Sequence, residues 1–309
     1  MNNHIEIKAL GLGTWRAAAG EVYDTVIEAI KIGYRHFDCA WIYGNEKEIG
    51  QAISDAIKMN LVKREDLFIT SKLWNDSHGK NNVEAAFKRS LSALNLDYID
   101  LYLIHWPVSF VEGIAFPESK EQLIANNFPL LLETWAEMEK LVDSGHIKSI
   151  GVSNFNIKKL DKLLDKARIK PVVNQVELHP YLAQDDLLAY CQDHQIILTA
   201  YSPLGSKGRD ISDQGNSVLE HPVIRSISEK YHITEAQVLI AWAINRHTIV
   251  IPKSINPKRL TQNYQAQFVK LEENDMQMIN QLDKKLRYVD GSFLAFENSE
   301  FTTEALWDK

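Results

Sequence analysis

The chain has 309 residues, of which 45% are hydrophobic and 24% charged, which is ordinary for a globular protein able to bury a core without disulfides or a structural metal. Its net charge of −7 and pI of about 5.8 exclude a general attraction to nucleic acid or to an anionic membrane surface. The mean hydropathy is −0.25, and no segment approaches the roughly 20 apolar residues of a membrane helix.

Short apolar runs alternate along the chain with amphipathic segments, and no linker or low-complexity tract interrupts the alternation. The apolar runs are β-branched and nearly continuous, which is typical of parallel strands covered by helices. We predict strands at residues 10–13, 34–38, 67–73, 99–105, 147–152, 172–176, 196–201 and 248–252. We predict helices at residues 21–32, 47–59, 81–94, 131–144, 157–166, 185–194, 220–246 with a break near 232–234, and 257–262.

Eight strands that are each followed by a helix, within about 260 residues, predict an α/β fold with one closed (β/α)8 TIM barrel, so that residues 1–309 form a single domain. An open, doubly wound sheet is the alternative. Three segments lie outside the eight units: a loop at 107–129, a loop at 204–216, and a tail at 270–309 with one further helix near 272–286. Loops that follow barrel strands lie on the face where active sites form, and we expect the tail to cover this face.

Polar residues lie at the ends of three neighbouring predicted strands. Asp38 ends the second strand, Lys72 the third and His105 the fourth, while Tyr43 lies in the loop after Asp38. A lysine held charged by a carboxylate would lower the pKa of a neighbouring tyrosine from about 10 toward the range of a general acid. The histidine could polarise a carbonyl oxygen. Each residue alone could equally be a loop anchor or part of an ion pair.

Aromatic residues also follow the predicted strand ends. They either fill the core beneath the loops or line an apolar pocket. Because barrel interiors favour Val, Ile and Leu over Trp, we expect a pocket for a small carbon-skeleton substrate. The five aromatic residues are Trp15, Trp41, Trp74, Trp106 and Phe110.

A basic segment after the last predicted strand is a candidate phosphate site. Lys253, Ser254 and Arg259 lie at the start of the helix predicted from residue 257. N–H groups at a helix start and basic side chains bind anions, and phosphate sites recur at this place in barrels. The alternative is that these basic residues are simply solvated.

Several familiar motifs are absent. Residues 11–13 begin like the dinucleotide fingerprint of a Rossmann fold, but Arg16 occupies the position of its third glycine. The ten histidines form no His-Glu-x-x-His motif and no His/Cys pairing, so we expect no metal site. No Gly-x-Ser-x-Gly motif is present either.

Taken together, ordered sequence blocks along nearly the whole chain resemble the aldo-keto reductase family, and the aldose, aldehyde and xylose reductase branch most of all. The blocks are GLGTW at 11–15, GYRHFD at 33–38, YGNE at 43–46, ITSKLW at 69–74, LDYIDLYLIHWP at 96–107, IGVSNF at 150–155, NQVE at 174–177, HPY at 179–181, AYSPLG at 200–205 and IPKS at 251–254. The resemblance implies a barrel that binds a dinucleotide without a Rossmann fold.

The resemblance also implies a role for each matching residue. Asp38, Tyr43, Lys72 and His105 correspond to the catalytic tetrad, with Tyr43 as the proton donor. The positions that correspond to the NADPH site are Ser153, Asn154 and Gln175 for the nicotinamide carboxamide, Tyr201 for stacking on the nicotinamide, Ser202, Leu204 and Ser206 for the pyrophosphate, Lys253, Ser254, Asn256 and Arg259 for the 2′-phosphate, and Gln262 and Asn263 near the adenine.

One departure concerns the cofactor. Asn256 stands where many members of the family have Thr, so we expect NADPH to be preferred and NADH to be a weaker alternative. The resemblance implies reduction of a small carbonyl substrate, an aldehyde or open-chain aldose and in some cases a ketone, to an alcohol. Two alternatives stay open at this point: a Schiff-base aldolase that uses Lys72, and a non-catalytic nucleotide-sensing subunit.

The cellular setting is a further expectation. Residues 1–6 contain no basic segment followed by an apolar run, so we expect no secretion signal. Cys39 and Cys191 allow at most one bridge, and we expect both to be reduced thiols. We therefore expect a cytoplasmic protein, present as a monomer or weak homodimer, that binds neither nucleic acid nor membranes.

Overall fold

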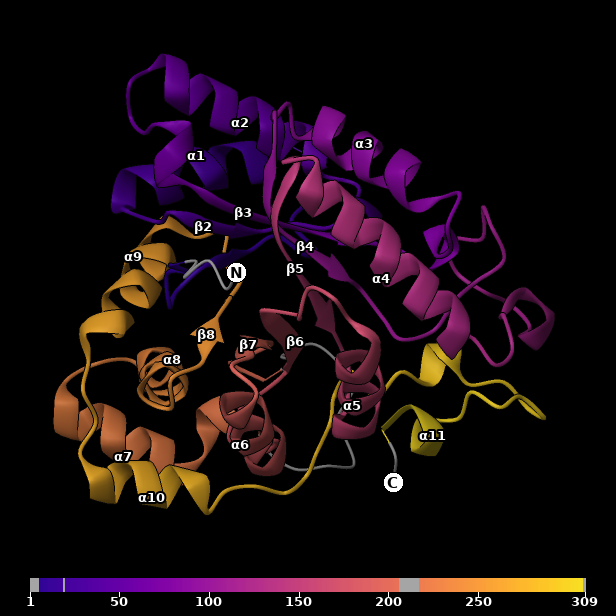
Figure 1. Ribbon diagram of the computed structural model, residues 1–309. Helices are drawn as coiled ribbons and strands as arrows, with labels where there is room; N and C mark the ends of the chain where they lie inside the picture. Colours follow the sequence, from indigo (N-terminus) through magenta and orange to yellow (C-terminus); the bar gives the residue numbers. More distant parts are fainter. Residues whose placement is uncertain (1–5, 19, 206–216, 308–309) are drawn as a thin grey trace.

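The computed structural model describes residues 6–18, 20–205 and 217–307. Eight parallel strands form one sheet whose order follows the chain, and the helices lie around it (Figure 1). The strands are β1 (Leu12–Gly13), β2 (His36–Asp38), β3 (Phe68–Leu73), β4 (Ile99–Ile104), β5 (Ile147–Ser153), β6 (Val173–Glu177), β7 (Ile197–Tyr201) and β8 (Ile249–Val250). All eight predicted strands are thus confirmed, several with shorter bounds than expected.

Helices follow the strands and supply the crossovers that parallel pairing requires. They are α1 (Val22–Ile32), α2 (Glu46–Lys58), α3 (Val83–Ala93), α4 (Phe128–Asp143), α5 (Ile157–Lys166), α6 (Asp185–Asp193), α7 (Pro222–Tyr231), α8 (Glu235–Asn245), α9 (Pro257–Gln265), α10 (Glu273–Asn280) and α11 (Thr303–Trp307). The predicted break near 232–234 is confirmed. His232 takes a left-handed conformation after α7, and Thr234 forms a capping box with Gln237 at the start of α8.

Two helix predictions were wrong. Helix α4 begins at Phe128 rather than at residue 131, because Pro129 lies in the first turn, where a missing N–H costs no hydrogen bond. The helix expected near 272–286 ends at Asn280, and a further short helix, α11, lies in the tail. The loop predicted at 204–216 lies almost entirely outside the described residues.

Strand alternation separates two sides of the sheet. In β4, Tyr102 and Ile104 belong to the large apolar cluster, whereas Leu101 and Leu103 belong to a smaller, separate one. Residues paired across parallel strands face the same side, and Lys72 pairs with Leu103. The register of β3 against β4 therefore places the Lys72 side chain on the side of the smaller cluster, away from the helices.

The first and last strands also meet through backbone hydrogen bonds. The Gly11 N–H donates to the Val250 carbonyl oxygen at 2.8 Å, and the Val250 N–H donates to the Ala9 oxygen at 2.8 Å. Leu10 and Val250 form a parallel bridge. The strand edge that β8 would otherwise expose is thus paired with the segment before β1.

Two negative findings complete the description. Within the described residues, no helix is long and apolar enough to span a membrane. Cys39 and Cys191 are both buried, and neither forms a disulfide.

Candidate active site

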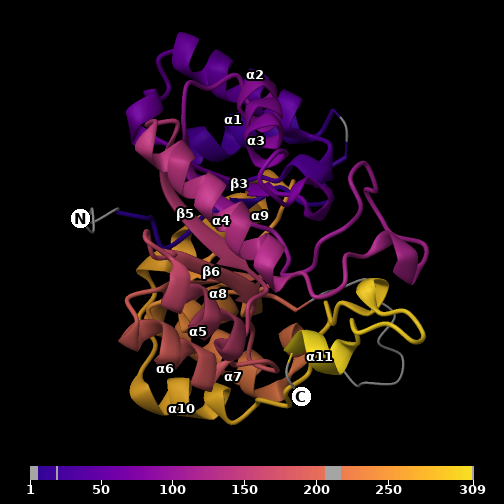
Figure 2. The ribbon, with the colours of Figure 1, turned by 45° about the vertical axis from the view of Figure 1, so that its right-hand side comes forward.

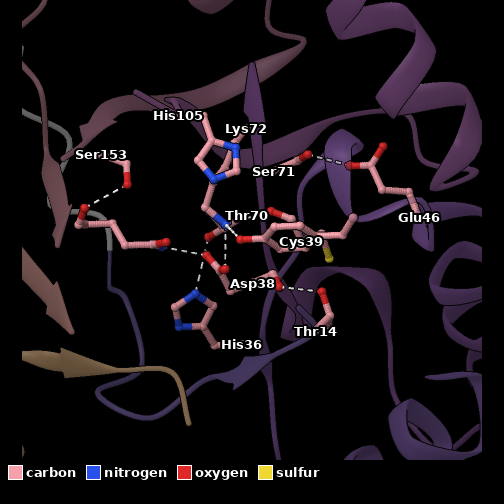
Figure 3. A network of polar contacts seen from close by, with 12 residues as sticks. Thr14, His36, Asp38, Cys39, Glu46, Thr70, Ser71, Lys72, His105 and Ser153 are labelled. Atoms are coloured by element: carbon pink, nitrogen blue, oxygen red, sulfur yellow. Dashed lines mark hydrogen bonds and ion pairs between the residues drawn. The ribbon is translucent and has the colours of Figure 1, made fainter. Parts of the chain in front are cut away.

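The Lys72 side chain is the centre of a buried polar network at the end of the sheet (Figure 3). Its Nζ donates to Asp38 Oδ1 at 2.5 Å, to the Cys39 carbonyl oxygen at 2.9 Å and to the Tyr43 hydroxyl at 3.3 Å. Strand β3 supplies Lys72, β2 supplies Asp38, and the turn after β2 supplies Tyr43. The structure thus joins three of the four residues that the sequence singled out.

Asp38 fixes the charge of Lys72. Its second carboxylate oxygen accepts a hydrogen bond from Gln175 Nε2 at 2.6 Å, and its backbone oxygen accepts one from the Thr14 hydroxyl at 2.8 Å. Burial alone would lower the pKa of Lys72, but Asp38 and Tyr43 outweigh burial and raise this pKa above its usual value. Lys72 is therefore a cation at neutral pH.

The expectation that Lys72 brings the pKa of Tyr43 below 10 was wrong. Burial raises the pKa of Tyr43 to about 12, because the phenolate would be poorly solvated, although Lys72 acts in the opposite direction. The sequence correctly indicated that Lys72 lowers the pKa of Tyr43. It did not show how deeply Tyr43 is buried, and burial has the larger effect on this pKa. At neutral pH, Tyr43 is a protonated hydroxyl that contacts a cation.

His105 follows β4 and faces the same network. Its ring centroid lies 5.8 Å from that of Tyr43 and 5.0 Å from that of Trp74. Burial, and then the charge of Lys72, holds the pKa of His105 well below its usual range. His105 is therefore a neutral imidazole with one N–H, and its Nδ1 has no hydrogen-bond partner.

The four residues expected near the nicotinamide are joined to one another. The Ser153 hydroxyl donates to the Gln175 backbone oxygen at 2.8 Å, and Asn154 Nδ2 donates to the His105 oxygen at 3.0 Å. The Tyr201 hydroxyl donates to Asn154 Oδ1 at 2.8 Å. Strands β5, β6 and β7 therefore bring these residues to the end of the sheet that holds Asp38 and His105.

The candidate phosphate site lies after β8, at the start of α9. Asn256 caps the helix, since its Oδ1 accepts the Arg259 N–H at 3.1 Å, and the Ser254 hydroxyl accepts the Asn256 N–H at 3.2 Å. The Lys253 and Arg259 side chains are exposed. Gln262 and the buried Asn263 follow on the same helix.

Two of the three residues expected near the pyrophosphate lie in the described part of the chain. Ser202 and Leu204 follow β7 and are partly buried. Ser206 lies outside the described residues.

The predicted pocket aromatics lie in two environments. Trp74, Trp106 and Phe110 are buried in an apolar cluster, and Trp41 packs at its edge. Trp15 is instead 39% exposed, and the Arg16 guanidinium lies 4.5 Å from its ring centroid. The cluster aromatics thus pack against one another and against neighbouring apolar residues, whereas Trp15 lies outside this cluster.

The tail supplies the other half of this apolar cluster. Leu294 and Leu306 are buried in it. The Trp106 ring centroid lies 5.4 Å from that of Phe293 and 6.1 Å from that of Trp307. Helix α11 lies beside the start of α5 (Figures 1 and 2), where the Lys159 amine donates to the Leu306 oxygen at 2.9 Å.

Sequence reasoning missed Glu177, which holds the tail in place. This carboxylate is fully buried at the end of β6. It accepts the Tyr288 N–H at 2.8 Å and the Val289 N–H at 2.7 Å, and His179 Nε2 lies 2.8 Å from it. The sequence pattern that indicated Asp38 also applied to Glu177, because both are polar residues at the end of a strand.

The comparisons with known proteins agree with this architecture. The family model described as "Aldo/keto reductase family" matches residues 9–284. The chain belongs to the aldo/keto reductase family. Membership makes the protein an oxidoreductase of carbonyl compounds.

Individual relatives are similar over nearly their whole length. An aldo/keto reductase of Synechocystis sp. is 48% identical, covering 100% of this chain and 95% of the relative. The human aldo-keto reductase family 1 member A1 is 44% identical, covering 91% of this chain and 87% of the relative. The solved structure of the aldose reductase from Schistosoma japonicum superposes with a TM-score of 0.86 at 40% identity, covering 94% and 93% of the two chains.

The role of Glu177 in this reductase generates a first prediction. Glu177→Gln replaces an acceptor oxygen by an NH₂ group that cannot accept a backbone N–H, so we expect the tail to detach more readily. A charge-assisted hydrogen bond contributes about 1.5–3 kcal/mol, and the loss should lower the melting temperature and speed proteolytic cleavage after residue 288. Glu297→Gln, at an exposed tail position, is the control. Equal cleavage rates in the two variants would contradict this role of Glu177.

Proposed function

We propose that this reductase converts aldehydes, including open-chain aldoses, to alcohols with NADPH, and that Tyr43 is the proton donor. The observation that carries the proposal is the buried contact of the protonated Tyr43 hydroxyl with the Lys72 cation, beside the neutral His105. Relatives named as an aldose reductase and as members of aldo-keto reductase family 1 support the substrate class.

The residues of the network would act on the carbonyl oxygen. Bound NADPH would supply the hydride that the carbonyl carbon receives. Tyr43 gives its proton to the carbonyl oxygen, so that a hydride and a proton together convert C=O to CH–OH. Lys72, 3.3 Å from the Tyr43 oxygen, stabilises the phenolate that remains, and Asp38 keeps Lys72 charged. His105 offers one N–H to orient the carbonyl oxygen.

The residues expected around the cofactor suit a phosphorylated dinucleotide. The start of α9 combines a capped helix N-terminus with the exposed cations Lys253 and Arg259, which suits the 2′-phosphate of NADPH. The amide and hydroxyl groups of Ser153, Asn154 and Gln175 can exchange partners with a carboxamide. We infer a preference for NADPH over NADH from the two cations.

The charged neighbours of Lys72 argue against the alternative of a Schiff-base aldolase. A Schiff-base lysine attacks as a neutral amine, which requires a lowered pKa. Asp38 and Tyr43 instead raise the pKa of Lys72. The buried network of Tyr43, Lys72 and Asp38 argues against the alternative of a non-catalytic subunit.

We also propose that residues 1–309 form one domain around a closed (β/α)8 barrel, with the tail over the catalytic face. The hydrogen bonds between Val250 and the segment before β1 support closure, and the packing of Leu306 against the aromatic cluster supports the place of the tail. The two buried, unbridged cysteines support a reducing compartment such as the cytoplasm.

The role of Tyr43 is tested by Tyr43→Phe. Removing the hydroxyl removes the proton donor, so kcat for aldehyde reduction should fall at least ~100-fold, the lower end of what general acid catalysis contributes. The Kd for NADPH, measured by fluorescence titration, should stay within about twofold. Tyr23→Phe is the control, because the Tyr23 hydroxyl of α1 donates to Asp55 of α2 at 3.1 Å and takes no part in the Lys72 network. Retention of more than a hundredth of kcat would reject the assignment.

The raised pKa of Tyr43 predicts opposite pH dependences for the two directions of reaction. Reduction needs the protonated hydroxyl, which persists below a pKa of about 12, so its single-turnover rate should be flat from pH 6 to about 10. Alcohol oxidation needs the phenolate, so its rate should rise about tenfold per pH unit over the same range. A plateau of the oxidation rate below pH 9, in protein that circular dichroism shows to be folded, would refute this pKa.

Cofactor discrimination is tested at the start of α9. Lys253→Ala and Arg259→Ala each remove a cation that would pair with the 2′-phosphate, so we expect KM for NADPH to rise by about tenfold or more, with little change for NADH. Lys270→Ala removes an exposed cation beyond the end of α9 and should change neither constant. Equal effects on NADPH and NADH would show that these residues do not contact the 2′-phosphate.

A further inference from the structure

Two buried polar residues follow the turn that carries Tyr43. The turn is a short 3-10 helix at Trp41–Tyr43, and Gly44 after it takes the left-handed conformation, with a φ of 70°. Asn45 and Glu46 come next, where α2 begins, and they are only 4% and 3% exposed. The hydrogen bonds of their side chains lead to the end of β1 and to β3. Both residues thus lie beside the proposed proton donor and contact the strands around it.

Asn45 makes a distant contact in place of a local one. An asparagine that precedes a helix commonly accepts a backbone N–H of the first turn. Asn45 makes no such cap on α2. Its Nδ2 donates instead to the Thr14 backbone oxygen at 2.9 Å, and the Thr14 hydroxyl donates to the Asp38 backbone oxygen at 2.8 Å. Asn45 therefore connects the segment after Tyr43 to the residue that holds the charge of Lys72.

Glu46 makes a similar contact on the other side of the segment. A carboxylate in the first turn of a helix is favourable even when it stays in water. The Glu46 side chain is buried instead, and it accepts a hydrogen bond from the Ser71 hydroxyl (Figure 3). Burial raises the pKa of Glu46, although the bond from Ser71 acts in the opposite direction. Burying a carboxylate is unfavourable, so Glu46, like Asn45, forgoes local stability for this contact.

The Ser71 partner is adjacent to Lys72 in the chain. Consecutive residues of a strand point to opposite sides, and Ser71 pairs with Tyr102 of the large apolar cluster. Ser71 therefore lies on the helix side of β3, where it contacts Glu46, while Lys72 points to Tyr43. The Tyr43 hydroxyl lies 3.3 Å from Lys72 Nζ, at the upper limit for a hydrogen bond, so a small outward shift of the turn would break this contact.

We propose that Asn45 and Glu46 are positioning residues, which hold the Tyr43 hydroxyl against Lys72 for proton transfer. Local preferences are commonly broken at functional sites, and here two consecutive residues forgo them for contacts beside the two strands that carry the ion pair. Neither residue is placed to touch the reacting atoms, so both act through Tyr43. The proposal rests on the proposed function, because it takes Tyr43 as the proton donor.

Single-turnover reduction of glyceraldehyde by the full-length protein with bound NADPH tests the role of Glu46. Glu46→Ala removes the oxygen that accepts the Ser71 hydroxyl. We expect the rate to fall at least about tenfold, since a displacement of about 1 Å at a reacting group can cost ~100-fold. The Kd for NADPH and the steady-state KM for glyceraldehyde should stay within about twofold, because neither ligand contacts Glu46.

Two matched variants accompany Glu46→Ala. Glu46→Gln keeps an acceptor oxygen for Ser71 and should recover most of the rate. Glu84→Ala removes an exposed glutamate from the first turn of the neighbouring helix α3 and should match wild type. An unchanged rate in Glu46→Ala, or a rate in Glu46→Gln as low as in Glu46→Ala, would overturn the positioning role.

Combination with Tyr43→Phe separates positioning from general damage to the fold. If Glu46 acts through the Tyr43 hydroxyl, adding Glu46→Ala to Tyr43→Phe should slow the remaining reaction by less than about twofold. A further loss as large as in the wild-type background would contradict the proposal. Asn45→Ala breaks the contact with Thr14 and should behave as Glu46→Ala does, and it decides the matter should Glu46→Ala fail to fold. A wild-type rate in Asn45→Ala would then overturn the proposal.

The same variants distinguish a failure of this proposal from a failure of the proposed function. A wild-type rate in Tyr43→Phe would reject Tyr43 as the proton donor and remove the basis of both. A slow Tyr43→Phe variant beside a fully active Glu46→Ala variant would overturn the positioning role alone.

Discussion

The buried ion pair of Lys72 and Asp38 is the interaction on which the candidate site depends. A charge removed from water is costly unless its partners replace the water, and removing one partner of such a pair typically costs about 3–5 kcal/mol. Here the partners come from β2, β3 and β6, because Gln175 completes the shell of Asp38. The protonation state of Lys72 therefore depends on the register of these three strands, because the register brings Asp38 to Lys72 and Gln175 to Asp38.

The site divides into a rigid half and a half assembled from loops. The polar half is held by strands, whose backbone positions are fixed by the sheet. The apolar half, with Trp74 and Trp106, is covered by a tail whose position depends on Glu177. Changes of sequence in the tail can therefore alter the shape of the apolar half while Tyr43 and Lys72 stay in place. One fold can in this way present sites of different shape.

The features predicted correctly from sequence are those that local pattern determines. Continuous apolar runs located the strands, and polar residues at strand ends located Asp38, Lys72 and His105. The features missed depend on contacts between distant residues. The bond from the Tyr288 N–H to Glu177 spans 111 positions, and no periodicity reveals it. The pKa of Tyr43 likewise depends on how deeply the folded chain buries a hydroxyl, which a charge pattern cannot show.

The attachment of the tail to β6 has a consequence for biosynthesis. Chains are made from the N-terminus, and all eight strands have been synthesised by Val250. The aromatic cluster, however, takes Leu294 and Leu306 from the last residues of the described chain. The tryptophan and phenylalanine side chains of this cluster therefore stay exposed on the newly made sheet until residue 306 has been synthesised, and exposed apolar surface of this kind favours aggregation.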